Sequence, residues 1–206
     1  MNHYLRFALV SLLFYFQSYA QNIDTIVDKG IYKSYYSFGY KSPLYVVYDL
    51  TNGGGDASRA KMYFKEEYRT PKNKDYAKSG FDKGHLVNAE DFAFDANLEK
   101  LTFSYFNCFA QNPKLNRGSW KSWETTIRNE SKKWPLRIYI GAIYGNRKLN
   151  NSVAVPEYCW KVVYNLKTGL LMHALIFKND ETAEVNRITI DELKKRLNYN
   201  IEFKKK

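Results

Sequence analysis

The tetrapeptide Asp82-Lys83-Gly84-His85 holds the residue types best suited to chemistry in this sequence. A histidine that ends a predicted strand, with a carboxylate three residues earlier, can be held in one tautomer by that carboxylate. Its other ring nitrogen then faces water or a substrate. That arrangement is the outline of a general base. A core or surface histidine is the ordinary alternative, and His173, within the apolar run 170–177, is typical of it.

Asn116, Glu124 and Arg128 form a second group of polar residues. An amide such as Asn116 can cap the start of a helix, and its oxygen is also an acceptable ligand for Mg²⁺. Glu124 and Arg128 are four residues apart, so they could form an ion pair, or they could order metal-bound water and hold a phosphate. In one straight helix Asn116 and Glu124 would be about 12 Å apart. We therefore expect Asn116 in the turn before the helix and Glu124 acting through water.

The elements around these residues predict an α+β protein. Trp120, Trp123 and Ile127 form an apolar stripe at helical spacing within a predicted helix over 118–133. Thr189 and Glu192 match a capping box that opens a helix to about residue 197. Strands are predicted over 44–50, 136–141, 158–164 and 170–177, with a glycine-rich turn at 51–56 and a polar loop at 65–80. This order indicates a mixed layered fold with a central antiparallel sheet.

The composition and net charge of the chain limit the classes of partner that it could bind. The 206 residues include 32 Lys+Arg against 21 Asp+Glu, a formal net charge of +11, which indicates a polyanion such as nucleic acid, an anionic membrane surface or an acidic polysaccharide. The mean hydropathy of −0.54 excludes a polytopic membrane protein. The length fits one domain, and no internal repeat or Pro-rich linker divides it.

The first twenty residues predict a signal peptide. An apolar run over 7–16 follows Arg6, and Ser18-Tyr19-Ala20 resembles a cleavage site. A membrane anchor is the alternative, but a spanning helix needs about 20 apolar residues. We expect a protein secreted or periplasmic after cleavage near Ala20, with one domain over 21–203 and a basic, disordered tail over 204–206.

Cys108 and Cys159 allow one disulfide in an oxidising compartment, or they are two small buried hydrophobic residues. Sequence alone leaves both readings open, because a bridge requires the two Cα atoms to approach within about 7 Å. The chain has no CxxC pair and no HExxH motif, which argues against a zinc site.

The spacing of the polar residues resembles the signature of the DNA/RNA non-specific endonuclease family, the ββα-metal nucleases. The run 82–86 is followed by Asn107, Gln111, Asn116-Arg117-Gly118, Trp120 and Glu124 at the spacing of that family. The motifs cover about 50 residues directly. The resemblance implies a ββα-metal active-site motif within the α+β fold. Two positions depart from the pattern: Lys83 stands where the family usually has Arg, and Ala110 where it tends to have Pro.

The resemblance also implies a role for each matching residue. His85 would be the general base and Asn116 the direct ligand of one Mg²⁺, with Mn²⁺ as a substitute. Glu124 would orient water around the metal and Asn107 would brace the site. The residues that would contact the substrate are Arg59 at the scissile phosphate, Arg128 as a secondary phosphate contact, Lys83, and Asp82 as motif support.

The implied activity is hydrolysis of phosphodiester bonds in DNA and RNA, without sugar specificity, by a one-metal mechanism that leaves 5′-phosphate ends. DNA and RNA, and not a membrane, are the expected partners. A catalytically inactive nucleic-acid-binding protein on the same scaffold is the alternative, supported by Lys83 alone. A cationic protein acting on membranes or polysaccharides would leave His85, Asn116 and Glu124 unexplained. A protein inhibitor, the oligomeric state and the preference between DNA and RNA are left open.

Overall fold

A computed structural model describes residues 23–150 and 152–204 of the chain. The predicted signal peptide over 1–20 and the tail residues Lys205 and Lys206 lie outside this range. Within it, no helix is long and apolar enough to cross a membrane.

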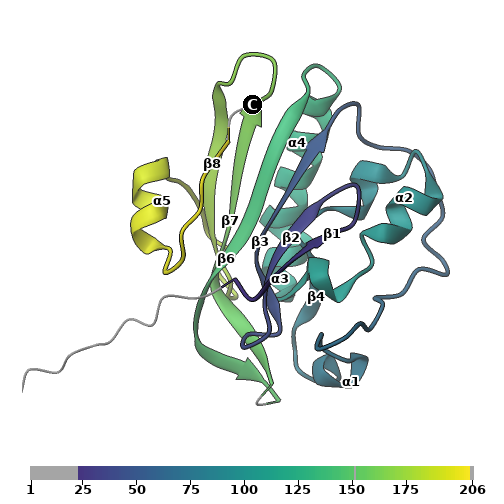
Figure 1. Ribbon diagram of the computed structural model, residues 1–206, viewed down its shortest axis with the longest axis vertical. Coiled ribbons are helices and arrows are strands. Elements are labelled where there is room, and N and C mark those ends of the chain that lie inside the picture. Colours follow the sequence, from purple (N-terminus) through teal and green to yellow (C-terminus); the bar gives the residue numbers. More distant parts are fainter. Residues whose placement is uncertain (1–22, 151, 205–206) are drawn as a thin grey trace, which may run out of the picture.

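A seven-stranded sheet forms the centre of the molecule (Figure 1). All neighbouring strands pair antiparallel, in the order β1-β2-β3-β6-β7-β8-β9. The predicted α+β fold with a central antiparallel sheet is therefore confirmed. Its strands are β1 (Thr25–Asp28), β2 (Lys33–Ser37), β3 (Ser42–Leu50), β6 (Leu136–Leu149), β7 (Val153–Asn165), β8 (Leu171–Lys178) and β9 (Val185–Arg187).

Short helical segments connect the strands, and two helices cover the faces of the sheet. The segments are α1 (Asn73–Tyr76), η1 (Ala89–Phe92), α2 (Ala96–Leu101), η2 (Tyr105–Asn107), α3 (Pro113–Leu115), η3 (Asn116–Trp120), α4 (Lys121–Ser131) and α5 (Ile190–Arg196). Since side chains alternate along a strand, Val163 of β7 packs with Ile127 of α4, whereas Val162 packs with Leu193 of α5. The predicted capping box at Thr189 and Glu192 begins α5.

A separate two-stranded sheet stands before α4. It pairs β4 (Asp82–His85) with β5 (Cys108–Gln111), antiparallel, so that Asp82 lies opposite Gln111 and His85 opposite Cys108. Gly84 leaves room for the Gln111 side chain of β5, because a Cβ there would lie 2.4 Å from the Gln111 side-chain oxygen. With α4 this pair forms the predicted ββα arrangement.

The predicted helix over 118–133 begins later than expected. Residues 116–120 form a wider, π-type turn with non-helical backbone angles at Gly118, φ −107° and ψ −113°, and the regular helix α4 starts at Lys121. The kink has a physical cause, since glycine tolerates backbone angles that other residues avoid. Asn116 thus lies in kinked residues before the helix, as its spacing from Glu124 indicated.

Three smaller expectations had different outcomes. The polar segment 65–80 is mostly loop but contains the short helix α1. Cys108 and Cys159 are both buried and free, so the disulfide does not form. The disordered tail from residue 204 stays a prediction; at Lys204, the last described residue, the backbone N–H donates to the Tyr139 hydroxyl at 2.9 Å.

Candidate active site

A cleft of about 580 Å³ lies where β4, the turn at Asn116 and α4 meet. It gathers six of the residues that the sequence singled out: Arg59, Lys83, His85, Asn116, Glu124 and Arg128. Asp82 and Asn107 are not among the lining residues, although Asp82 bonds Asn116 and Arg117, which are. The lining is completed by residues for which no role was predicted: Asn88, Ala89, Glu90, Arg117, Lys121 and Thr125. The cleft carries five Lys or Arg side chains against two Glu, so it favours an anion.

His85 ends β4 and is held by aromatic packing. Its ring lies 4.6 Å from the centre of the Phe64 ring and meets Phe103 edge-on at 4.8 Å. Nε2 is buried and has no hydrogen-bond partner among the described residues. Burial, together with the charge of Arg59, lowers the pKa of His85 to about 3. At neutral pH the imidazole is therefore unprotonated, the form that a general base requires.

Asp82 does not hold His85, which corrects the expectation from their spacing. Its Oδ2 accepts hydrogen bonds from Asn116 Nδ2 and Arg117 Nε, both at 2.9 Å, and its Oδ1 accepts from Arg117 Nη2 at 2.7 Å. The carboxylate thus ties β4 to the turn before α4. Because the amide nitrogen of Asn116 is occupied by Asp82, its Oδ1 is the end that can accept a cation.

Glu124 projects from the first turn of α4 with 10% of its side chain exposed. The nearest cation is Lys161 of β7, whose Nζ is 3.9 Å from Glu124 Oε1. Burial raises the pKa of the Glu124 carboxyl, against the effect of the Lys161 charge. The same burial lowers the pKa of Lys161. A bound cation would favour the charged carboxylate, because opposite charges stabilise one another in a buried site.

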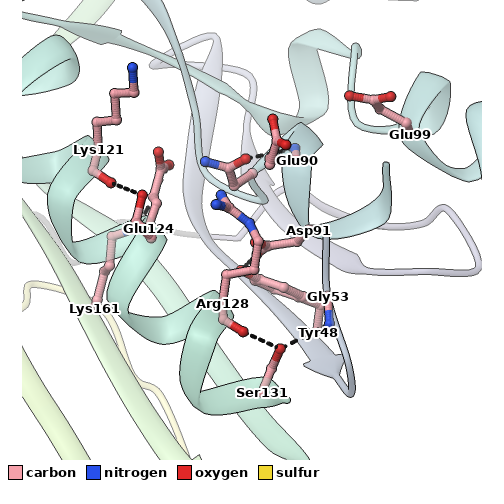
Figure 2. Close-up of polar contacts among 12 residues, drawn as sticks. Tyr48, Gly53, Glu90, Asp91, Glu99, Lys121, Glu124, Arg128, Ser131 and Lys161 are labelled. Atoms are coloured by element: carbon pink, nitrogen blue, oxygen red, sulfur yellow. Dashed lines mark hydrogen bonds and ion pairs between the residues drawn. The ribbon is translucent and has the colours of Figure 1, made fainter. Parts of the chain in front are cut away.

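Arg128 pairs with Asp91 of η1 and not with Glu124 within the described residues. Its Nε donates to Asp91 Oδ1 at 2.9 Å, and the Tyr48 hydroxyl donates to Asp91 Oδ2 at 2.8 Å. Figure 2 shows Arg128 between Glu124 on its own helix and Asp91 across the gap. The pair fixes the guanidinium at the cleft wall, and its role as a phosphate contact stays a prediction.

Arg59 approaches the cleft from the loop after β3. Gly55 lies against the backbone of Ala93, and Ala57 N–H donates to the Ala93 carbonyl at 3.0 Å, which anchors the loop. The guanidinium forms ion pairs with Glu90 and with Glu99, the latter at 2.8 Å, and 46% of the side chain is exposed. Burial raises the pKa of Glu99. Arg59 is thus oriented by two carboxylates and still open to the cleft.

Lys83 and Asn107 differ in their access to the cleft. Lys83 lines it, while its ammonium donates to the Asn73 side-chain oxygen and lies over the Phe64 and Tyr105 rings. Asn107 is fully buried behind His85. Its amide donates to the carbonyls of Val87 and Thr102, both at 2.9 Å, and accepts from Val87 N–H at 2.8 Å. These bonds join η2 to the chain that follows β4, which suits a bracing role.

Asp91 and Lys161, the buried partners of Arg128 and Glu124, were not predicted from the sequence. A signal for Lys161 existed: it is the one charge in the run 158–164, whose other members are aromatic, β-branched or cysteine. A lysine within such a strand indicates a buried ammonium. Asp91 gave no comparable signal, because it is one of several acidic residues close together in the sequence, with Glu90 and Asp95.

The residues present fit a hard divalent cation. Asn116 Oδ1 and the Glu124 carboxylate are oxygen donors at the cleft, the ligand type that Mg²⁺ prefers with its remaining positions filled by water. The described residues hold no group of three or more His, Cys, Asp or Glu side chains that could bind a metal ion. Asn116 would hold the cation and Glu124 would orient its water.

Comparisons with known proteins place the chain in a family. Relatives include the mitochondrial nuclease EXOG of Xenopus laevis, 28% identical over 63% of this chain and 42% of that protein. Mitochondrial endonuclease G of Bos taurus is 29% identical over 60% of this chain and 48% of that protein. The chain thus spans about half the length, or less, of these relatives.

A solved structure of an EndoG/EndoGI complex shares the fold, with a TM-score of 0.74, 21% identity and coverage of 85% of this chain and 84% of that chain. The model of the DNA/RNA non-specific endonuclease family matches residues 10–206. The chain belongs to the DNA/RNA non-specific endonuclease family.

Proposed function

We propose that this protein is a secreted, metal-dependent endonuclease that hydrolyses phosphodiester bonds of both DNA and RNA. The observation that carries the proposal is the meeting of His85, Asn116 and Glu124 in one cleft with an excess of basic side chains. These residues come from a strand, a turn and a helix, and their meeting supplies a base, a cation ligand and a buried carboxylate around one space. The family membership supports the same reading.

In the proposed reaction neutral His85 removes a proton from a water molecule, which attacks phosphorus in line. The bond from phosphorus to the 3′ oxygen breaks, so the product carries a 5′-phosphate. Mg²⁺, when bound, offsets the charge that develops on the phosphate and the departing oxygen. Arg59 and Arg128 line the same cleft, where their guanidinium groups would face the phosphate oxygens.

The charge of the cleft supports low sequence specificity. Its charged side chains suit phosphate groups, and contacts to phosphate position a nucleic acid without reading its sequence. No role in this mechanism requires the sugar 2′-hydroxyl, so one site would accept both nucleic acids.

Location and regulation form part of the proposal. Residues 1–20 predict export with cleavage near Ala20, whereas the relatives named above are mitochondrial proteins. The structural relative was solved as a complex that concerns its inhibition. A protein inhibitor that covers the cleft would be compatible with the same fold here.

The test is cleavage by purified mature protein. Plasmid DNA and a structured RNA are incubated with Mg²⁺, with Mn²⁺ and with a chelator, beside Asn116→Ala. We expect both substrates to be cut with either metal, 5′-phosphate ends that a ligase accepts, and loss of cleavage with chelator or Asn116→Ala. Intact substrates that the wild type nevertheless retards in a gel would favour the nucleic-acid-binding alternative and overturn the proposal.

A further inference from the structure

Lys161 lies within β7 and is almost completely buried, with an exposed fraction of 1%. By strand alternation it shares a sheet face with Cys159 and Val163, which pack in the core cluster that contains Trp120. An ammonium group removed from water carries a large desolvation cost unless nearby groups compensate it. The surroundings of Lys161 supply that compensation in two ways.

Lys161 contacts both segments that carry the proposed cation ligands. Its Nζ lies 3.7 Å from the centre of the Trp120 ring and 3.9 Å from Glu124 Oε1. Trp120 ends the turn that begins at Asn116, and Glu124 lies one helical turn later on α4. A desolvated cation over an indole ring is a favourable arrangement.

The Trp120 ring is held in place by packing and therefore restricts the position of the Lys161 ammonium. It is fully buried and meets Phe109 of β5 edge-on at 5.7 Å and Phe177 of β8 at 5.0 Å. Because two neighbouring strands hold the ring, the ammonium above it has little freedom to move. A carboxylate attracted to that ammonium is then fixed relative to the sheet as well as to its own helix.

The other buried charges near Glu124 are already paired. Arg128 bonds Asp91, which also accepts from the Tyr48 hydroxyl. Lys161 reaches Glu124 from β7 of the central sheet and is not among the residues that line the cleft, and the charges of Asp91 and Arg128 act on it as well. Lys161 therefore faces Glu124 from the core, on the side opposite the open cleft.

We propose that Lys161 is a positioning residue, whose buried ammonium fixes the Glu124 carboxylate in the orientation from which it orders water around the bound cation. The proposal rests on the proposed function and adds a part to its site. Lys161 touches neither substrate nor cation and acts through Glu124.

The experiment compares Lys161→Met with wild type. Met has a similar length, suits a buried position and lacks the charge. A matched control, Lys178→Met, removes one positive charge from an exposed position on β8, where Lys178 pairs with Asp180. For each protein, kcat and KM for an oligonucleotide are measured at saturating Mg²⁺, Mn²⁺ affinity is measured by calorimetry without substrate, and urea unfolding gives the folded fraction.

We expect Lys161→Met to lower kcat and Mn²⁺ affinity about 10- to 100-fold, the usual effect of losing a residue that orients a metal site. KM should change little, and the protein should stay folded, since a buried ion replaced by an apolar side chain is often tolerated. Lys178→Met should match wild type in kcat and Mn²⁺ affinity. Wild-type kcat and Mn²⁺ affinity in folded Lys161→Met would overturn the proposal.

A double-mutant cycle tests whether Lys161 acts through Glu124. In a Glu124→Gln background, adding Lys161→Met should cause no further loss of kcat or Mn²⁺ affinity. A change of up to about twofold counts as no further loss, because that is the usual error of such cycles. An equal loss in both backgrounds would place the effect elsewhere and overturn the proposal. If wild type cleaves nothing, the proposed function fails, and the calorimetric cycle still decides the role of Lys161. A wild type that also binds no Mn²⁺ overturns both.

Discussion

At the scale of single residues, the site depends on packing as much as on polar contacts. His85 is oriented by Phe64 and Phe103, whereas Asp82, its neighbour in the motif, holds Asn116 and Arg117. An imidazole packed in this way loses water and stays neutral. A negatively charged phosphate in the cleft would raise its pKa toward the range in which it takes a proton readily.

The low pKa of His85 predicts a pH-dependent stability. The imidazole takes up a proton near pH 6.5 in the unfolded chain but only near pH 3 in the folded protein. Its contribution to stability is thus fully present above pH 6.5 and is lost as the pH falls toward 3. As the pH is lowered, we expect the unfolding free energy of wild type to fall relative to that of His85→Gln, by at most about 1.4 kcal/mol per pH unit.

Urea unfolding of both proteins from pH 7.5 to pH 4 measures this difference, because carboxyl groups common to both proteins cancel. A difference that stays constant over the whole range would mean that His85 protonates equally in the folded and unfolded chains. That result would contradict the packing account of its neutrality.

At the scale of elements, two glycines shape the site for different reasons. Gly84 lets β4 approach Gln111 of β5, and Gly118 allows the kink that separates Asn116 from α4. The strand pair and the kinked turn together place a base and an amide at one end of α4. Glycine stands at these two motif positions because Gly84 has no room for a Cβ and Gly118 has non-helical backbone angles.

Gly84→Ala should destabilise the protein by about 1–3 kcal/mol, because the added Cβ would lie 2.4 Å from Gln111 Oε1 and 2.7 Å from Gln111 Cβ. Cleavage should fall as well, since His85 follows directly. Gly39→Ala is the matched control, because the nearest atom to its Cβ would be Ser37 Oγ at 3.7 Å. Urea unfolding measures both variants, and equal midpoints for them would show that the strands do not need the close approach.

Periodicity and spacing predicted the elements that carry a strong local pattern. The strands at 44–50, 136–141, 158–164 and 170–177 and the stripe of Trp120 and Ile127 all correspond to observed elements. The short strands β1, β2, β5 and β9 were not predicted, because a pairing of three to five residues depends on neighbours far along the chain. The motif located His85 and Asn116 but not Lys161, because spacing relates residues near one another in sequence and Lys161 arrives from β7. Asp91 lies within the span of the motif, but the motif has no position for it.

At the scale of the whole molecule, part of the formal net charge of +11 is concentrated at the cleft. Five basic side chains line the cleft, and lysines elsewhere add a field that would attract nucleic acid, the proposed substrate, from solution. Binding through phosphate contacts releases counterions, so its strength depends on salt.

Activity should therefore fall as salt rises. With about three phosphate contacts, kcat/KM on duplex DNA would drop roughly 40-fold between 50 and 200 mM NaCl at constant Mg²⁺. Lys121→Gln, in the cleft, should reduce the slope of log kcat/KM against log salt by about 1, whereas Lys178→Gln, outside it, should not. Rates independent of salt would contradict a phosphate-based interface.

The most direct test of the account is the single-turnover rate of plasmid cleavage by His85→Ala at saturating Mg²⁺, with plasmid binding measured in parallel. His173→Ala removes the other described histidine, which pairs with Glu130 beneath α4, and serves as the control. The account predicts a rate lower by about 10²- to 10⁴-fold in His85→Ala, the usual contribution of a general base, with binding retained and the control unaffected. A wild-type rate in His85→Ala would contradict it.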